Sequence, residues 1–132
     1  MHRSPLIAHS QRHTEQWAQY AERAANRSPQ DWQAIAQAAE RLNADLAEAM
    51  DAGVEPGSPE ANQLAERHRE AFGEYFVITR EMQVCLGRKY ETNAEFSAHY
   101  NAVRPGLASW LRKAIDANAA AHGIDPDTAT WQ

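Results

Sequence analysis

The sequence predicts an all-α protein, and three features of the chain support this class. Apolar side chains recur every three or four residues over long stretches, as they do on one face of a helix. Serine–proline pairs at 28–29 and 58–59 are typical of helix starts, because serine caps free backbone N–H groups and proline suits the first turn. Alanine is frequent while valine and isoleucine are scarce, which favours helix over sheet.

We expect about five to six helices in a single domain. Glycines and prolines mark their ends, and Thr92 with Glu95 predicts a capping box for the fifth helix. A joint apolar face should continue across the break at Pro105-Gly106, made by Phe96, Tyr100, Val103, Leu107, Leu111 and Ala114. The expected helices span 10–26, 29–52, 60–76, 79–90, 93–103 and the stretch after the break that ends at Gly123.

The two ends of the chain differ from the predicted helical part. Residues 1–9 are expected to form a flexible leader. Residues 123–132 are expected to form a flexible, polar tail in which Trp131 is loose. The folded domain is therefore predicted to span residues 10–122.

Composition excludes several classes of function. The chain has 132 residues and a net charge of −5, with no basic stripe, so direct nucleic-acid binding is not expected. It lacks the roughly 18 consecutive apolar residues of a membrane helix and has no signal peptide pattern. A single cysteine suggests a reducing compartment, so we expect a cytoplasmic protein. No motif calls for a cofactor or a metal ion, and the oligomeric state is left open.

Cys85 is the one nucleophilic thiol of the chain. On a helix it lies at the border of an apolar stripe, one turn from Glu81, Arg88 and Lys89. The two cations would favour the thiolate and the glutamate would oppose it. Helix geometry alone favours a small buried residue over a reactive one. A catalytic pair of Cys85 with His68 or with His99 is the least supported alternative.

The second half of the chain resembles the TipAS drug-recognition domain, the effector part of some MerR-type multidrug-responsive transcription activators. The shorter, stand-alone form of that domain is the better match, because no MerR-type DNA-binding part is seen. The resemblance covers about residues 13–122. It is carried by Thr14, Asp31-Trp32, Met50-Asp51-Ala52-Gly53, His68-Arg69, Glu81-Met82, Cys85-Leu86-Gly87, Tyr90, Phe96, Pro105-Gly106-Leu107-Ala108, Ala114-Ile115 and Asn118.

The resemblance implies a globin-like helical fold without haem and a cleft for thiopeptide or similar large heterocyclic antibiotics. In thiopeptide-binding members, a cysteine in a Met-x-x-Cys-Leu-Gly pattern attacks a dehydroalanine of the drug, and residues 82–87 match that pattern. Cys85 is thus a candidate for covalent attachment, by addition of a soft thiolate to a Michael acceptor. Further candidate ligand-binding residues are Met82, Tyr75, His68 and Trp110.

Two functions remain open from the sequence. The first is a protein that binds and sequesters such an antibiotic, acting as a drug sensor or as a resistance or immunity protein. The second is the non-covalent multidrug-binding effector domain of a MerR-type activator, in which Cys85 is only structural. Neither function is enzymatic.

Overall fold

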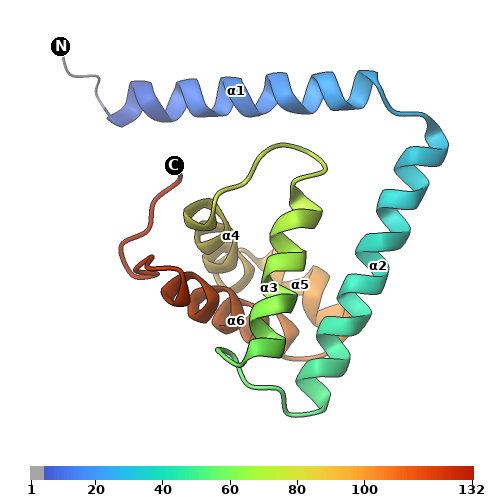
Figure 1. The fold of residues 1–132 in the computed structure, drawn as a ribbon, viewed down its shortest axis with the longest axis vertical. Helices are drawn as coiled ribbons and strands as arrows, with labels where there is room; N and C mark the ends of the chain where they lie inside the picture. Colours follow the sequence, from blue (N-terminus) through green and yellow to red (C-terminus); the bar gives the residue numbers. More distant parts are fainter. Residues whose placement is uncertain (1–4) are drawn as a thin grey trace.

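The computed structural model of the chain describes residues 5–132, with side chains described from residue 14 onward, and this part consists of six helices without a strand. In Figure 1, α2 and α3 lie side by side, while α1 crosses the end of the molecule at a steep angle to α2. No helix in the described part is both long and apolar enough to span a membrane. The helices are α1 (Pro5–Ala25), α2 (Pro29–Asp51), α3 (Pro59–Phe72), α4 (Arg80–Thr92), α5 (Ala94–Val103) and α6 (Leu107–Ala121).

The predicted starts of α2 and α3 are confirmed. The Ser28 hydroxyl accepts a hydrogen bond from the Asp31 amide at 3.1 Å, and the Asp31 carboxylate accepts one from the Ser28 amide at 2.9 Å. Ser58 caps α3 with its hydroxyl alone, which accepts a hydrogen bond from the Ala61 amide at 3.2 Å. In both helices proline follows the cap, so the local sequence alone sets these two boundaries.

Several helix boundaries differ from the sequence prediction. The helix α1 begins at Pro5, inside the predicted leader 1–9, of which residues 1–4 lie outside the described residues. The helix α3 ends at Phe72 instead of 76, because the chain turns at Gly73 into an irregular segment. The cap of α5 is Asn93, whose side chain accepts from two amides. Thr92 belongs to α4 and donates its hydroxyl to the Arg88 carbonyl.

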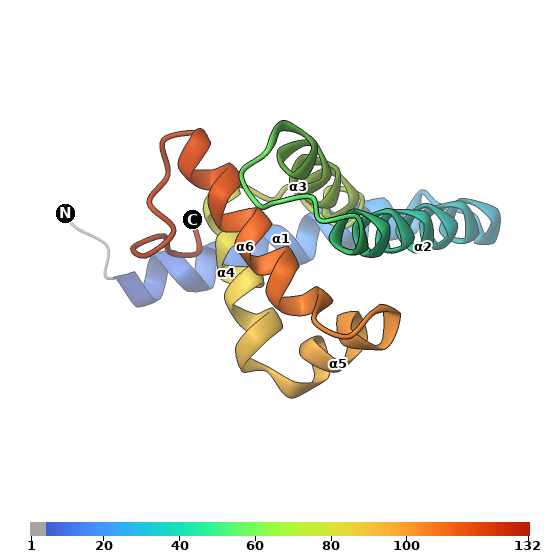
Figure 2. The same cartoon turned by 90° about the horizontal axis from the view of Figure 1, so that it is seen from below.

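The core lies where α4 and α6 pack against each other, as Figure 2 shows. Met82, Leu107 and Leu111 are at most 1% exposed there, and α2 contributes Leu46. Two residues of the predicted joint face, Phe96 and Val103, are instead 40% and 36% exposed. The left-handed backbone of Gly106, with φ of +89°, redirects the chain between α5 and α6, so the apolar face is not continuous across the break.

The C-terminal segment 123–132 is packed against the domain, unlike the unpacked tail expected from its polar sequence. Ala129 is buried, and Trp131 packs on the core and donates its indole N–H to the Gln16 side chain at 3.3 Å. Arg88 holds the tail through the carbonyls of Pro126 and Ala129 at 2.5 and 2.7 Å. The tail is therefore anchored through its backbone carbonyls. Every residue has such a carbonyl, so the sequence of the tail gave no sign of this contact.

Two glycines near helix contacts should respond oppositely to replacement by alanine. A Cβ at Gly87 would lie 3.5 Å from Arg112 Cγ and 3.6 Å from Ile115 Cδ1, which is ordinary van der Waals contact. Gly87→Ala should therefore stabilise the protein by about 0.5–1 kcal/mol through helix propensity. A Cβ at Gly73 would lie 2.9 Å from the Glu70 carbonyl oxygen, so Gly73→Ala should destabilise. Urea unfolding measures both, and a loss of stability in Gly87→Ala would contradict the spacing of α4 and α6.

Candidate ligand-binding cleft

A cleft of about 570 Å³ lies between α2, α3 and α5. This volume is in the usual range for a small-molecule site. A second hollow of about 360 Å³ adjoins it and shares Phe72, His99 and Tyr100 with it. The cleft is lined by Ala34, Ile35, Ala38, Ala39, Leu42 and Asn43 from α2, by Arg67, His68, Glu70, Ala71, Phe72, Glu74 and Tyr75 from α3 and the segment after it, and by His99 and Tyr100 from α5.

One wall of the cleft ends in an aromatic stack, of which Tyr75 is the member that lines the cleft. The Tyr75 ring stacks on Trp32 of α2, with centroids 6.2 Å apart and planes at 20°. The same ring also stacks on Tyr20 of α1, with centroids 6.4 Å apart and planes at 27°. The Arg27 guanidinium sits over the Trp32 ring at 5.0 Å, a cation–π contact. This stack joins α1, α2 and the end of α3, and Tyr75 carries it to the edge of the cleft.

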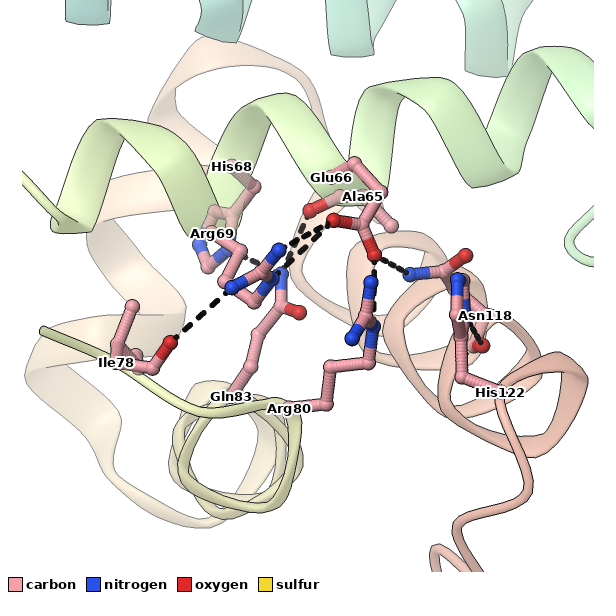
Figure 3. A network of polar contacts seen from close by, with 9 residues as sticks. All are labelled: Ala65, Glu66, His68, Arg69, Ile78, Arg80, Gln83, Asn118 and His122. Atoms are coloured by element: carbon pink, nitrogen blue, oxygen red, sulfur yellow. Dashed lines mark hydrogen bonds and ion pairs between the residues drawn. The ribbon is translucent and has the colours of Figure 1, made fainter.

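The floor of the cleft is buried and polar: His68 lines the cleft, and Gln83 and Tyr90, which do not line it, hold the His68 ring in place. His68 is 2% exposed, and its Nε2 lies 2.9 Å from the Tyr90 hydroxyl. Gln83 of α4 bridges the Ala65 carbonyl, at 2.7 Å, and His68 Nδ1, at 2.9 Å, as Figure 3 shows. Burial lowers the pKa of His68 to about 4. The imidazole is therefore neutral at physiological pH and acts through hydrogen bonds instead of charge.

A second network lies beside this floor and is structural. Glu66 accepts hydrogen bonds from Arg69, Arg80 and Asn118 and so ties α3 to α4 and α6, as seen in Figure 3. Burial alone would raise the pKa of Glu66, but the hydrogen bonds and the Arg69 charge bring it down to about 2. The carboxylate is ionised and fully engaged, so it is not available to a ligand.

The structure brings together two of the five candidate ligand-binding residues. His68 and Tyr75 both line the cleft. Met82 is 1% exposed and its sulfur accepts a hydrogen bond from Gln16 of α1 at 3.5 Å. Trp110 is bonded through its indole N–H to the Val54 carbonyl at 3.0 Å. Neither of these two side chains lines the cleft, because Met82 belongs to α4 and Trp110 to α6.

Cys85 also lies outside the set of residues that line the cleft. Its sulfur is 3.8 Å from Arg88 Nη1 and 3.9 Å from the Ala129 carbonyl, so it faces the C-terminal tail, and neither His68 nor His99 contacts it. Burial raises the pKa of the Cys85 thiol, and the charges of Arg88 and Lys89 offset this only in part. The cationic neighbours thus do not make it a thiolate at rest.

Sequence reasoning missed several residues of the cleft. It assigned Tyr100 to the joint apolar face, and it named His99 only as a partner for Cys85. The available signal was the tyrosine itself, because a phenol within an otherwise apolar stripe needs a hydrogen-bond partner when it is buried. The Tyr100 hydroxyl lies 3.4 Å from that of Tyr90, which is where the stripe meets the polar floor.

The free energy of unfolding should decrease as the pH is lowered below about 6.5, and His68 is the cause. Its pKa is about 4 in the folded protein and 6.5 as a free side chain, so between these values only the unfolded chain binds the proton. The loss should reach about 2 kcal/mol at pH 5 and about 3 kcal/mol at pH 4. Glu66 adds a further loss only below about pH 4.5. Urea unfolding at pH 7.5 and 5 measures the difference, and His68→Gln should remove most of it. Equal stability of the unmodified chain at both pH values would contradict a buried neutral imidazole.

Comparisons with known proteins identify the family of the chain. A model of the TipAS antibiotic-recognition domain matches residues 9–118. The HTH-type transcriptional activator TipA of Streptomyces coelicolor is 36% identical over 110 residues, which are 83% of this chain and 44% of that protein. The HTH-type transcriptional regulator SkgA of Caulobacter vibrioides is 31% identical over 91 residues, which are 67% of this chain and 36% of that protein. The chain thus spans less than half the length of either relative.

Among solved structures, the fold is similar to that of TipAS from Streptomyces lividans in complex with nosiheptide, from a thiopeptide antibiotic multidrug resistance system. The TM-score is 0.73 and the sequence identity 35%, over 82% of this chain and 76% of the other. With most of its length matched in both sequence and fold, this chain belongs to the TipAS antibiotic-recognition domain family.

Proposed function

We propose that this chain binds a thiopeptide or a similar large heterocyclic antibiotic without covalent attachment, in the cleft between α2, α3 and α5. The observation that carries the proposal is the cleft itself, which combines an aromatic wall with a buried polar floor. Flat heterocycles stack on aromatic rings, and a few fixed polar groups orient them. The complex of the similar TipAS structure with nosiheptide supports this class of ligand.

Binding is proposed to hold the drug and not to change it. A catalytic site of the nucleophilic kind needs a nucleophile within hydrogen-bond reach of a base. His68 is engaged by Gln83 and Tyr90, and Cys85 contacts Arg88 and the tail. The chain would therefore act by stoichiometric capture, either as a resistance protein that lowers the free drug concentration or as the sensing part of a regulator. The net charge of −5 argues against promoter binding by these residues themselves.

Covalent capture by Cys85 is the second candidate, favoured by the match of residues 82–87 to the Met-x-x-Cys-Leu-Gly pattern. A thiolate would add to the β-carbon of a dehydroalanine, forming a C–S bond, and the resulting carbanion would take a proton from water. The raised pKa of Cys85 and its contacts with the tail oppose this in the resting structure. The tail would have to move for a large ligand to reach the sulfur.

Truncation of the aromatic wall should weaken drug binding. In Tyr75→Ala, nosiheptide should bind roughly tenfold more weakly, because one stacking contact and its buried area are lost. Isothermal titration calorimetry at pH 7.5 measures the affinity, and circular dichroism checks that the helices persist. Trp110→Phe is the matched control, since Trp110 is a large aromatic residue outside the cleft, and its affinity should stay unchanged. Equal affinities of the unmodified protein and Tyr75→Ala would place the drug elsewhere.

Intact mass spectrometry separates the covalent and non-covalent candidates. After incubation with nosiheptide and denaturation, the protein should return its unmodified mass, and Cys85→Ser should bind the drug as tightly as the unmodified chain does. A stable one-to-one adduct that is absent in Cys85→Ser would instead establish capture by the thiol.

A further inference from the structure

The first helix, α1, is attached to the rest of the domain at separate points and not along a packed face. In the described part of the chain no other helix packs closely along it, and in Figure 1 it crosses the end of the molecule. Trp17, in its middle, is 69% exposed. One group of contacts joins its second half to the segment after α3, where Tyr20 stacks on Tyr75. A second group of contacts is made by Gln16.

Gln16 joins α1 to both the C-terminal tail and α4. It is 8% exposed and is the one buried residue among the described side chains of α1. The indole N–H of Trp131 only donates, so the side-chain oxygen of Gln16 is its acceptor, at 3.3 Å. The amide nitrogen of Gln16 then donates to the Met82 sulfur, a weak acceptor, at 3.5 Å. Of the two contacts, the stronger one is therefore with the tail.

The tail is fixed to α4 on both sides of Trp131. Before Trp131 in the chain, Arg88 of α4 donates to two carbonyls of the tail. After it, the hydroxyl of Thr79, which caps the start of α4, donates to the main-chain oxygen of Gln132 at 2.6 Å. Because its neighbours on either side are held, the indole of Trp131 is kept in place beside Gln16.

The same tail covers one side of Cys85. The Cys85 sulfur lies 3.9 Å from the Ala129 carbonyl oxygen and 3.8 Å from Arg88 Nη1, the atom that also donates to this carbonyl. The thiol is half-buried, and burial raises its pKa, which agrees with a covered sulfur. Approach to the sulfur from this side requires Ala129 to move, and Ala129 is two residues from Trp131 in the chain.

We infer that the C-terminal tail is a strap that couples access to Cys85 with the attachment of α1. While the strap is docked, it covers the sulfur and holds Gln16 through Trp131. When it leaves, the sulfur is uncovered and Gln16 keeps only its weak contact with Met82. The coupling is reciprocal, so a change in α1 that weakens the bond to Trp131 also uncovers Cys85 more often. The strap is a property of the ligand-free protein and does not depend on the proposed function.

Alkylation of Cys85 by iodoacetamide, which forms a C–S bond and releases iodide, measures how often the strap is open. Trp131→Phe keeps an aromatic ring in the strap but loses the N–H donated to Gln16, so alkylation should be about fivefold faster. Gln16→Leu removes the same bond from the side of α1, far from the thiol, and should have a similar effect. Trp17→Phe is the matched control, because this exposed tryptophan of α1 contacts Tyr20, and its rate should stay unchanged.

Two further measurements separate the strap from other causes of faster alkylation. The rate is followed against pH to its plateau, where the thiol is fully ionised, so that a change of the thiol pKa is not counted as access. Urea unfolding gives the rate expected from opening of the whole domain, and a rise explained by that alone would overturn the strap.

The double variant tests the coupling itself. Because Trp131→Phe and Gln16→Leu remove one and the same bond, the two changes together should be no faster than either alone. Independent, multiplied effects would contradict a shared bond. An unchanged rate in Trp131→Phe would show that the tail does not control access to Cys85, and an unchanged rate in Gln16→Leu would show that α1 is not coupled to it.

Discussion

The buried amide of Gln83 is the contact on which the geometry of the cleft depends. It reaches from α4 into α3, where it donates to the Ala65 carbonyl and to the His68 ring. Gln83 is 1% exposed, so an apolar replacement would leave both acceptors unpaired in the core. His68 is held by Gln83 on one side and by Tyr90 on the other. The position of α4 against α3, and with it the floor of the cleft, follows from these directional bonds and not from apolar packing alone.

The wall of the cleft is held in a different way from its floor. Tyr20 and Tyr75 stack between α1 and the segment after α3, and Arg23 donates to the Gly73 carbonyl at 2.6 Å. Gln19 accepts from the Val77 amide nearby. These contacts are exposed or partly buried, so each contributes less than a bond in the core. The domain thus combines a floor fixed by buried hydrogen bonds with a wall held by ring stacking, which tolerates changes of ring position better than a directional bond does.

Local signals in the sequence predicted the helical frame, whereas His68 and Tyr75 of the cleft were named from the family resemblance. Ser28 and Ser58 start helices because a hydroxyl and the proline after it act within one turn, so no distant residue is needed. The packed tail was missed because Arg88 holds it through backbone carbonyls, which every residue type offers equally. Tyr100 was missed as a residue that lines the cleft, because helical spacing identifies a buried face but does not distinguish a core from the wall of a cleft.

Three of the four residues that define the Met-x-x-Cys-Leu-Gly pattern, Met82, Cys85 and Gly87, have an explanation in helix packing. Along α4, Met82 meets Gln16 of α1, Gln83 meets α3, and Cys85 meets the tail. Gly87 faces α6, where a Cβ would touch Arg112 and Ile115. A central helix that is covered on four sides restricts its residues by size and polarity at each position, whether or not a ligand reacts with any of them. The pattern is therefore strong evidence for the family fold and weak evidence for a reactive thiol, and the chemistry of Cys85 has to be measured on the thiol itself.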